Sequence, residues 1–279
     1  MRVVKDKNFD EERALYGARD TLVEDCIFAG PADGESALKE SRGVEVKNCR
    51  FSLRYPLWHA DGFLLAGSSL DELTRAPIWY AKNGRVENCE ITGVKCLREC
   101  ESVSFAGTKV VSAEFGWRCK NVNAENCEMT SEYFLFETAG GHFNELNFKG
   151  KYSFQYTNDL VVENSVLDTK DAFWHAKNIL VKNCTVKGEY LAWYSENVTF
   201  ENCKIIGTQP LCYCKGLKLI NCEMEATDLA FEYSEVEADI RGHVDSVKNP
   251  LSGHIVADSI GEIILRDSVM ETNCEISTR

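Results

Sequence analysis

The chain has 279 residues, of which 44% are hydrophobic and 27% charged, and its formal net charge is −13. These contents are ordinary for a soluble globular protein, and the acidic balance argues against nucleic acid or an anionic membrane as a partner, because both are bound through clustered Lys and Arg. The sequence shows neither an apolar leader nor an apolar run of 18 residues, so we expect a cytoplasmic protein that does not contact a membrane.

The first thirteen residues differ from the rest of the chain. Residues 1–13 are polar and contain the acidic run "NFDEER", and we expect them to form a partly helical cap. A repeat begins after them and is marked by a Cys that usually follows Asn. Its members are Cys26, Cys49, Cys89, Cys127, Cys184, Cys203 and Cys222, with Ser165 as a variant. From Cys89 to residue 241 these anchors fit a strict period of nineteen residues.

Each repeat has the pattern of three short strands. Apolar residues stand three positions before and two positions after the anchor, with polar residues between them, as in "VENCEITG" at 86–93. Alternation with a period of two is typical of a half-buried strand. A third strand lies about ten residues upstream, as in "DAFWHAKN" at 171–178. Such coils can bury their apolar faces only by stacking, which predicts an all-β parallel β-helix of about twelve coils.

The regular coils are expected over residues 14–241. Beyond them the register breaks, so we expect a loop over 242–255 and a last coil with a tail over 256–279. With no linker-like segment in the chain, residues 1–279 are expected to form a single domain. The open end of a β-helix exposes strand edges, so the tail either covers this end or leaves it to a second copy, which would give a homo-oligomer.

The repeat resembles the right-handed, single-stranded parallel β-helices of the pectin-lyase-like superfamily. The motif that carries the resemblance is Val-x-Asn-Cys-x-Ile followed by Gly, and the resemblance covers about residues 14–270. The chain is also similar to a bacterial family of such β-helices known as a domain of unknown function. The resemblance implies that a substrate would lie along a face of parallel strands. The catalytic signatures of polygalacturonases and the acidic calcium cluster of pectate lyases have no counterpart in this sequence.

The recurrent Asn and Cys are predicted to be structural. The Cys column accepts Ser at 165, and a second column accepts Cys, Ala, Ser or Thr, as at Cys214, Ala176, Ser195 and Thr157. Positions that accept only small residues are packing positions, so we expect buried free thiols. The Asn residues are expected to satisfy turn amides. We therefore expect no metal centre and no cofactor.

Two neighbouring columns are the candidates for function. One contains charged and aromatic residues, which are rarely buried, so we expect it to face outward. It consists of Glu40, His59, Tyr80, Glu99, Arg118, Glu137, Tyr156, His175, Tyr194, Tyr213 and Glu232. The preceding column holds Trp58, Trp79, Trp117, Trp174 and Trp193, and alternation sends it inward, although Lys39 and Arg98 in the same column disagree and a bulge would reverse the parity.

The outward column suggests carbohydrate binding or carbohydrate chemistry. Aromatic faces and charged groups suit sugar rings, so we assign substrate binding to His59, Tyr80, Tyr156, Tyr194 and Tyr213. We assign catalysis of a glycoside hydrolase or lyase type to Glu99, Arg118, Glu137 and His175. Glu99 and Glu137 lie two coils apart, roughly 9.5 Å, which fits an inverting glycosidase. The alternative is a non-catalytic scaffold that binds another protein, its aromatic residues forming a ladder that only stabilises the stack.

Overall fold

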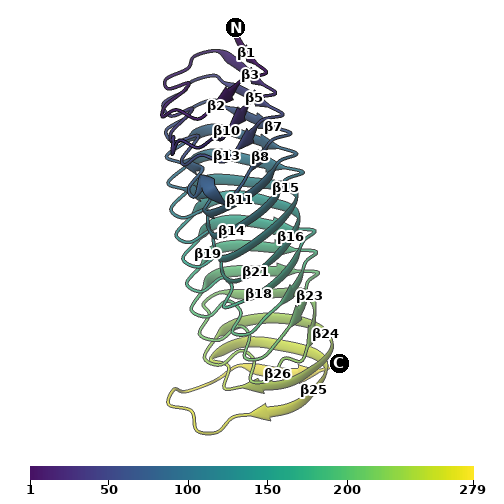
Figure 1. Ribbon diagram of the computed structural model, residues 1–279. Coiled ribbons are helices and arrows are strands. Elements are labelled where there is room, and N and C mark those ends of the chain that lie inside the picture. The colour runs from purple at the N-terminus through teal and green to yellow at the C-terminus, as the bar shows by residue number, and fades with distance from the viewer. The chain divides into compact units, whose positions relative to one another are not determined.

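The computed structural model describes all residues, 1–279, and consists of β-strands apart from one short 3₁₀ turn, η1 (Glu72–Thr74). The chain forms two compact units, Met1–His142 (unit 1) and Phe143–Arg279 (unit 2). In each unit the strands of successive coils pair in parallel and stack one above another (Figure 1). No helix of the structure is long or apolar enough to span a lipid bilayer.

Unit 1 contains two long ladders of parallel strands and a short third one. The first ladder runs through β1 (Arg2–Lys5), β3 (Thr21–Glu24), β5 (Glu45–Lys47), β7 (Leu64–Ala66), β10 (Lys82–Glu87), β13 (Glu101–Ala106) and the start of β15 (Lys120–Phe134). The second runs through β2 (Asn8–Phe9), β4 (Ile27–Phe28), β6 (Arg50–Phe51), β8 (Ser69–Leu70), β11 (Glu90–Lys95), β14 (Lys109–Phe115) and the end of β15. The third pairs β9 (Ile78–Trp79) with β12 (Leu97–Arg98).

Unit 2 continues the same plan with its own strands. One ladder contains β17 (Asn158–Glu163), β19 (Lys177–Lys182), β21 (Glu196–Glu201), β23 (Leu217–Glu225), β24 (Glu235–Lys248), β25 (Ser252–Ile264) and β26 (Glu275–Thr278). The other contains β16 (Ala139–Ser153), whose first residues belong to unit 1, then β18 (Val166–Lys170), β20 (Thr185–Lys187) and β22 (Lys204–Ile206), and it ends on the later parts of β23, β24 and β25.

The repeated Asn-Cys pair forms the corner between two strands of a coil. Asn202 adopts a left-handed conformation with φ of 52°, which Asn tolerates better than most residues, and its side-chain amide donates to Asn183 Oδ1 at 3.3 Å. Cys203 follows it into the core, where its thiol donates to the carbonyl of Val181 in the preceding coil at 3.3 Å. The corner therefore needs a small buried residue with a weak donor, which Cys supplies.

The predicted all-β parallel β-helix is confirmed, with about fifteen turns of about 19 residues instead of twelve. Additional strands lie at both ends of the sequence. Residues 1–13 contain β1 and β2, which pair with β3 and β4 as a first coil, and Val4 fills an inner position there. Residues 242–255 are largely strand, because β24 continues to Lys248 and β25 begins at Ser252. The single-domain organisation of residues 1–279 stays a prediction.

Coil length explains why the strand in 242–255 was not predicted. His243 pairs with Ser259, sixteen residues later, whereas Val181 pairs with Phe200, nineteen residues later. The coil at the end of unit 2 is therefore shorter and carries no Asn-Cys corner. Val244, which stands between exposed His243 and Asp245, and Val247 are still fully buried, so core positions remain filled although the spacing of the repeat changes.

Candidate functional site

The outward column predicted from the sequence, which we call the outer stripe, lies at a sharp corner of each coil. Ten of its eleven residues have φ between 50° and 60°, the left-handed region that non-glycine residues seldom adopt. None of the eleven is buried. The stripe divides between the units, with Glu40, His59, Tyr80, Glu99, Arg118 and Glu137 in unit 1, and Tyr156, His175, Tyr194, Tyr213 and Glu232 in unit 2.

In unit 2 the aromatic residues of the stripe stack on one another. Ring centroids are 4.9 Å apart for Tyr156 and His175, 5.1 Å for His175 and Tyr194, and 4.7 Å for Tyr194 and Tyr213, with interplanar angles of 9–13°. The face of each inner ring is thus occupied by the ring of the next coil. A ligand that approaches the stripe here meets ring edges and phenol hydroxyls, whereas sugar binding by stacking needs free faces.

In unit 1 the structure brings three of the four predicted catalytic residues together. Arg118 Nε donates to Glu137 Oε2 at 2.8 Å, and this hydrogen bond raises the pKa of Arg118. Glu99 and Arg118 line an open depression of about 320 Å³ together with Lys82, Glu101 and Lys120. His175, the fourth candidate, belongs to unit 2, where it is part of the aromatic stack.

The geometry of this charged cluster does not favour acid–base catalysis. A general acid of the glycosidase type is kept protonated by apolar, dry surroundings. Glu99 and Glu137 are both exposed, and Glu137 is engaged in an ion pair with Arg118. Apart from the buried Cys100, the side chains that line the depression are charged, so it offers little apolar wall to exclude water.

The tryptophan column is half-buried, so neither of the two orientations that the sequence left open holds in full. Four of the five indoles donate Nε1–H to a backbone carbonyl sixteen to eighteen residues ahead, as Trp193 does to Gln209 O at 2.7 Å. The left-handed residue that follows each Trp interrupts the alternation, and both columns therefore reach the surface. Arg98 fits the column because its guanidinium lies 4.9 Å from the ring centres of Trp79 and of Trp117.

A second depression of unit 1, which we call the aromatic depression, was not predicted. It has a volume of about 380 Å³ and is lined by Tyr55, Trp58, Arg75, Ala76, Trp79, Val94 and Lys95. The Trp58 and Trp79 rings are parallel to within 3°, with centroids 5.2 Å apart. Tyr55 lies against Trp58 at 4.5 Å and is tilted by 31°, and the guanidinium of Arg54 lies 5.8 Å from the centre of its ring.

Backbone hydrogen bonds hold the lining of the aromatic depression in place. Trp58 Nε1 donates to Ala76 O at 2.7 Å, and Trp79 Nε1 donates to Lys95 O at 2.8 Å. The carbonyl of Arg75 accepts from the amides of Val94 and Lys95, both at 2.9 Å. The turn η1, with Asp71 as its N-cap, brings Arg75 to this position.

The sequence does contain a signal for this depression. The anchors Ser68 and Cys89 are 21 residues apart instead of nineteen. The two extra residues lie in the coil that contains η1 and Arg75. A coil with two extra residues, next to two successive coils that carry Trp, therefore indicates where an additional turn forms one side of a depression.

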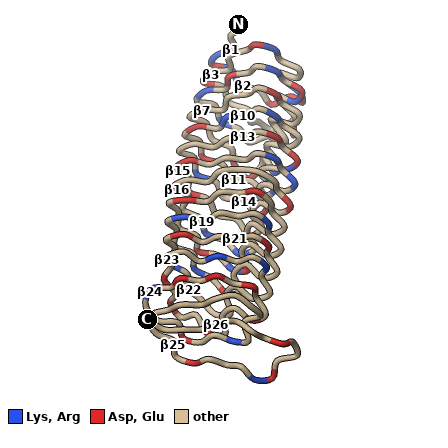
Figure 2. Tube along the Cα trace, turned by 180° about the vertical axis from the view of Figure 1, so that it is seen from behind, with Lys and Arg blue, Asp and Glu red and all other residues tan.

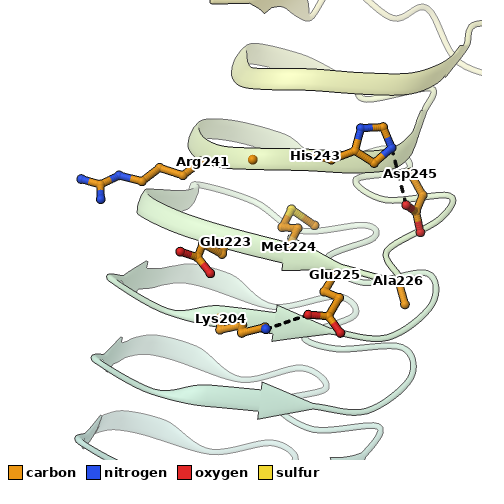
Figure 3. A pocket seen from close by; sticks show the side chains of 9 residues that line it. Lys204, Glu223, Met224, Glu225, Ala226, Arg241, His243 and Asp245 are labelled. Carbon is orange, nitrogen blue, oxygen red and sulfur yellow. Dashed lines mark ion pairs between the residues drawn. The ribbon is translucent and has the colours of Figure 1, made fainter.

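Unit 2 has a depression of its own, of about 270 Å³, between β22, β23 and β24 (Figure 3). Lys204 Nζ lies 2.6 Å from Glu225 Oε2, His243 Nε2 lies 3.7 Å from Asp245 Oδ1, and Glu223 and Arg241 also line the depression. The other ring nitrogen of His243 is 2.9 Å from Ser259 Oγ. No group of three or more His, Cys, Asp or Glu residues in the structure could hold a metal ion.

The thirteen cysteines are free, and twelve are buried, which confirms the prediction of buried free thiols. Burial raises the pKa of Cys49 and Cys212 to about 12. Nucleophilic cysteine chemistry needs an accessible thiolate. These thiols therefore serve packing. Basic and acidic residues are interspersed along the backbone of each unit (Figure 2).

The solved structures to which the chain is similar match it at very low sequence identity and with low TM-scores. Tailspike protein 3 of bacteriophage CBA120 is 9% identical, with a TM-score of 0.35, and the match covers 99% of this chain and 51% of the tailspike. The A-module of mannuronan C-5 epimerase AlgE4 from Azotobacter vinelandii is 8% identical, with a TM-score of 0.28, covering 98% of this chain and 86% of the module. The chain thus spans about half the length of the tailspike.

A third solved structure is the fluoroquinolone resistance protein QnrB1, which is 11% identical, with a TM-score of 0.26, covering 61% of this chain and 84% of QnrB1. No curated protein matches the sequence significantly. One family model matches residues 2–277, nearly the whole chain. The chain therefore belongs to the family described as "Protein of unknown function (DUF3737)".

Proposed function

We propose that the protein is a carbohydrate-binding β-helix without catalytic activity, and that it binds an oligosaccharide at the aromatic depression of unit 1. The observation that carries this proposal is the meeting of three aromatic rings and two cations around one concavity of about 380 Å³. Ligand sites combine apolar and aromatic walls with a few polar groups that orient the ligand. Arg75 and Lys95 supply those polar groups, and Tyr55, Trp58 and Trp79 supply the walls. Lys95 Nζ also lies 3.4 Å from Glu114 Oε1.

A sugar is the ligand class that matches this lining. Its ring offers C–H groups to aromatic side chains and hydroxyls to Arg and Lys donors. Tyr55 contacts a single ring, Trp58, at a tilt of 31°, in contrast to the stripe residue Tyr194, which is stacked between His175 and Tyr213. The depression is open, which suits a segment of a chain of sugars better than a fully enclosed small molecule.

Tyr55 and its equivalent in unit 2 provide a matched pair of variants. Tyr190 precedes Trp193 by three residues, as Tyr55 precedes Trp58, with ring centroids 5.2 Å apart. Both tyrosines are half-buried and left-handed, with φ of 59° and 56°. Removing either ring therefore has a similar structural cost, but only Tyr55 lines the aromatic depression.

The test begins with the full chain on an array of neutral and acidic oligosaccharides, followed by calorimetric titration with the oligosaccharide that binds best. We expect Tyr55→Ala to weaken binding by roughly 30-fold, the loss of about 2 kcal/mol that is typical of a central aromatic contact. Tyr190→Ala and Glu137→Gln should bind within about twofold of the wild type. A wild-type protein that binds no sugar, or equal losses for both tyrosine variants, would overturn the proposal.

A second candidate function is a non-catalytic scaffold that binds another protein. The observation that favours it is the self-stacked stripe of unit 2, where Tyr156, His175, Tyr194 and Tyr213 cover one another's faces. A row of edges and hydroxyls suits a protein surface better than a sugar ring. If the folded wild type binds none of the oligosaccharides on the array, this second function is favoured.

A further inference from the structure

The last coil of unit 2 is covered over only half of its length. β26 pairs with β25 through His254, Ile255, Val256 and Ala257. The later part of β25, from Ser259 to Ile264, pairs with β24 on one side. In the structure, no strand pairs with its other side. This edge contains neither Lys nor Pro, the residues that usually protect exposed edges.

The uncovered half also leaves core positions in contact with water. Val244 and Val247 are fully buried, but Ile263, which pairs with Val247 one coil later, is 47% exposed, and Ile260, which pairs with Val244, is partly exposed. Under β26 the situation differs, since Ile255 and Ala257 are fully buried. The exposure of Ile260 and Ile263 therefore results from the missing cover.

The residues that come after β25 add exposed apolar surface. Leu265 is 61% exposed and Val269 is 89% exposed. They belong to the connection from β25 to β26, which extends away from the last coil (Figure 1). The amide of Val269 donates to the Tyr233 hydroxyl at 3.1 Å, so this connection is attached to the body of unit 2.

We propose that the end of this edge, Glu262–Arg266, binds a second copy of the same chain, and that these segments of the two copies pair antiparallel around a two-fold axis. The edge is self-complementary when the axis passes through Ile264. Ile263 of one copy then lies opposite Leu265 of the other, and Glu262 lies opposite Arg266 of the second copy. Within one chain Glu262 Oε1 and Arg266 NH2 are 3.6 Å apart, so each can exchange its own partner for that of the second copy.

The opposite end of the chain does not provide an equally good partner surface. At the first coil Met1 and Val3 are 69% and 60% exposed, but the inner residue Val4 is only 9% exposed, in contrast to 47% for Ile263. A head-to-tail contact would therefore cover little additional core and would also propagate into a filament. The two-fold arrangement covers both open edges at once and closes at a dimer.

The experiment measures the molar mass of the full chain by light scattering after gel filtration. We expect the wild type to elute as two chains of 31.4 kDa each. Ile263→Lys should weaken the dimer by roughly 100-fold, because it buries a charge in the contact. Ile220→Lys is the matched control, since Ile220 is also 47% exposed and lies on β23, away from the edge. It should remain dimeric.

Charge reversal tests the register of the pairing independently. Glu262→Arg alone should dissociate the dimer, because it places two Arg side chains opposite each other, whereas Glu262→Arg with Arg266→Glu should restore it. Far-ultraviolet circular dichroism confirms that each variant is folded. The proposal would be overturned by a wild type that is monomeric at about 100 μM or by a dimer that survives Ile263→Lys. Larger head-to-tail assemblies, or a double variant that stays monomeric, would overturn it as well.

Discussion

At the scale of single residues, the outer stripe combines unfavourable backbone conformations with solvent-exposed side chains. Glu99, Arg118 and Glu137 have φ of 50–53°, a conformation that costs an L-residue about 1–2 kcal/mol. Aromatic, acidic and basic side chains all occupy these positions, namely those of Tyr, His, Glu and Arg. The coil geometry, and not the residue type, therefore determines the backbone at this corner.

Glu99 offers a direct test of that strain. We expect Glu99→Asn to raise the free energy of unfolding by about 0.5–1 kcal/mol, because Asn tolerates the left-handed region. Glu99→Val should lower it by about 1–2 kcal/mol, because a β-branched side chain does not. Urea titrations followed by circular dichroism measure both changes. Equal stabilities for the two variants would show that the corner is not strained.

At the scale of the coil, alternation and spacing predicted most of the strands but not all of them. The corners at Asn183-Cys184 and Asn202-Cys203 were predicted because nineteen residues separate them. β1 and the second half of β24 were missed because their coils carry no Asn-Cys pair, although Val4 and Val244 are each buried between exposed neighbours. A search for alternation alone, without the anchor, could have found the second half of β24, but not β1, in which the apolar residues Val3 and Val4 are adjacent.

The candidate site was predicted only in part, for a physical reason that concerns three-dimensional neighbours. Tyr55, Arg75 and Val94 come from different coils and meet only because the coil between Ser68 and Cys89 is lengthened. The sequence identified Trp58 and Trp79 as members of a column. It could not show that the turn η1 would place Arg75 beside them as part of the lining of a depression. It also could not show which ring faces the stacking would cover.

Close contacts between coils give a prediction for glycine. A Cβ on Gly207, where φ is 130°, would lie 1.9 Å from the carbonyl oxygen of Gly188 in the preceding coil, whereas a Cβ on Gly242, where φ is 83°, would meet nothing within 4 Å. Gly207→Ala should therefore cost clearly more than Gly242→Ala, which is penalised by the backbone conformation alone at about 1–2 kcal/mol.

Thermal unfolding of these two glycine variants provides the comparison. The melting temperature of Gly207→Ala should fall several degrees below that of Gly242→Ala, since each kcal/mol shifts the midpoint of a chain of this size by about 2–4 °C. Equal melting temperatures would mean that the coils can separate to admit a methyl group. The close approach between Gly207 and Gly188 would then not limit the spacing of the coils.

At the scale of the whole molecule, the buried thiols make stability depend on alkaline pH. Burial raises the pKa of Cys49 and Cys212 to about 12 and that of Cys214 to about 11, from an ordinary value of 9.0. Between pH 9 and pH 11 the unfolded chain therefore binds fewer protons than the folded one. Stability that is fully present below pH 9 is lost as the pH rises.

We expect each of these thiols to remove on the order of 1 kcal/mol of stability between pH 9 and pH 10. Urea midpoints measured at both pH values give the loss for the wild type. A Cys49→Ala, Cys212→Ala double variant should start from lower stability but lose about 2 kcal/mol less over this interval. An identical loss in the double variant would show that other groups cause the alkaline destabilisation.

The parallel indoles also have an optical consequence. Trp58 with Trp79 in unit 1, and Trp174 with Trp193 in unit 2, are parallel to within 3° at centroid separations of 5.2 and 5.5 Å. Transition dipoles at such separations couple, and face-to-face stacking of parallel rings weakens the indole absorption band (hypochromism), a signal that a single indole does not give. Each unit thus carries its own chromophore pair, and the loss of that signal reports the separation of neighbouring coils in that unit without any attached label.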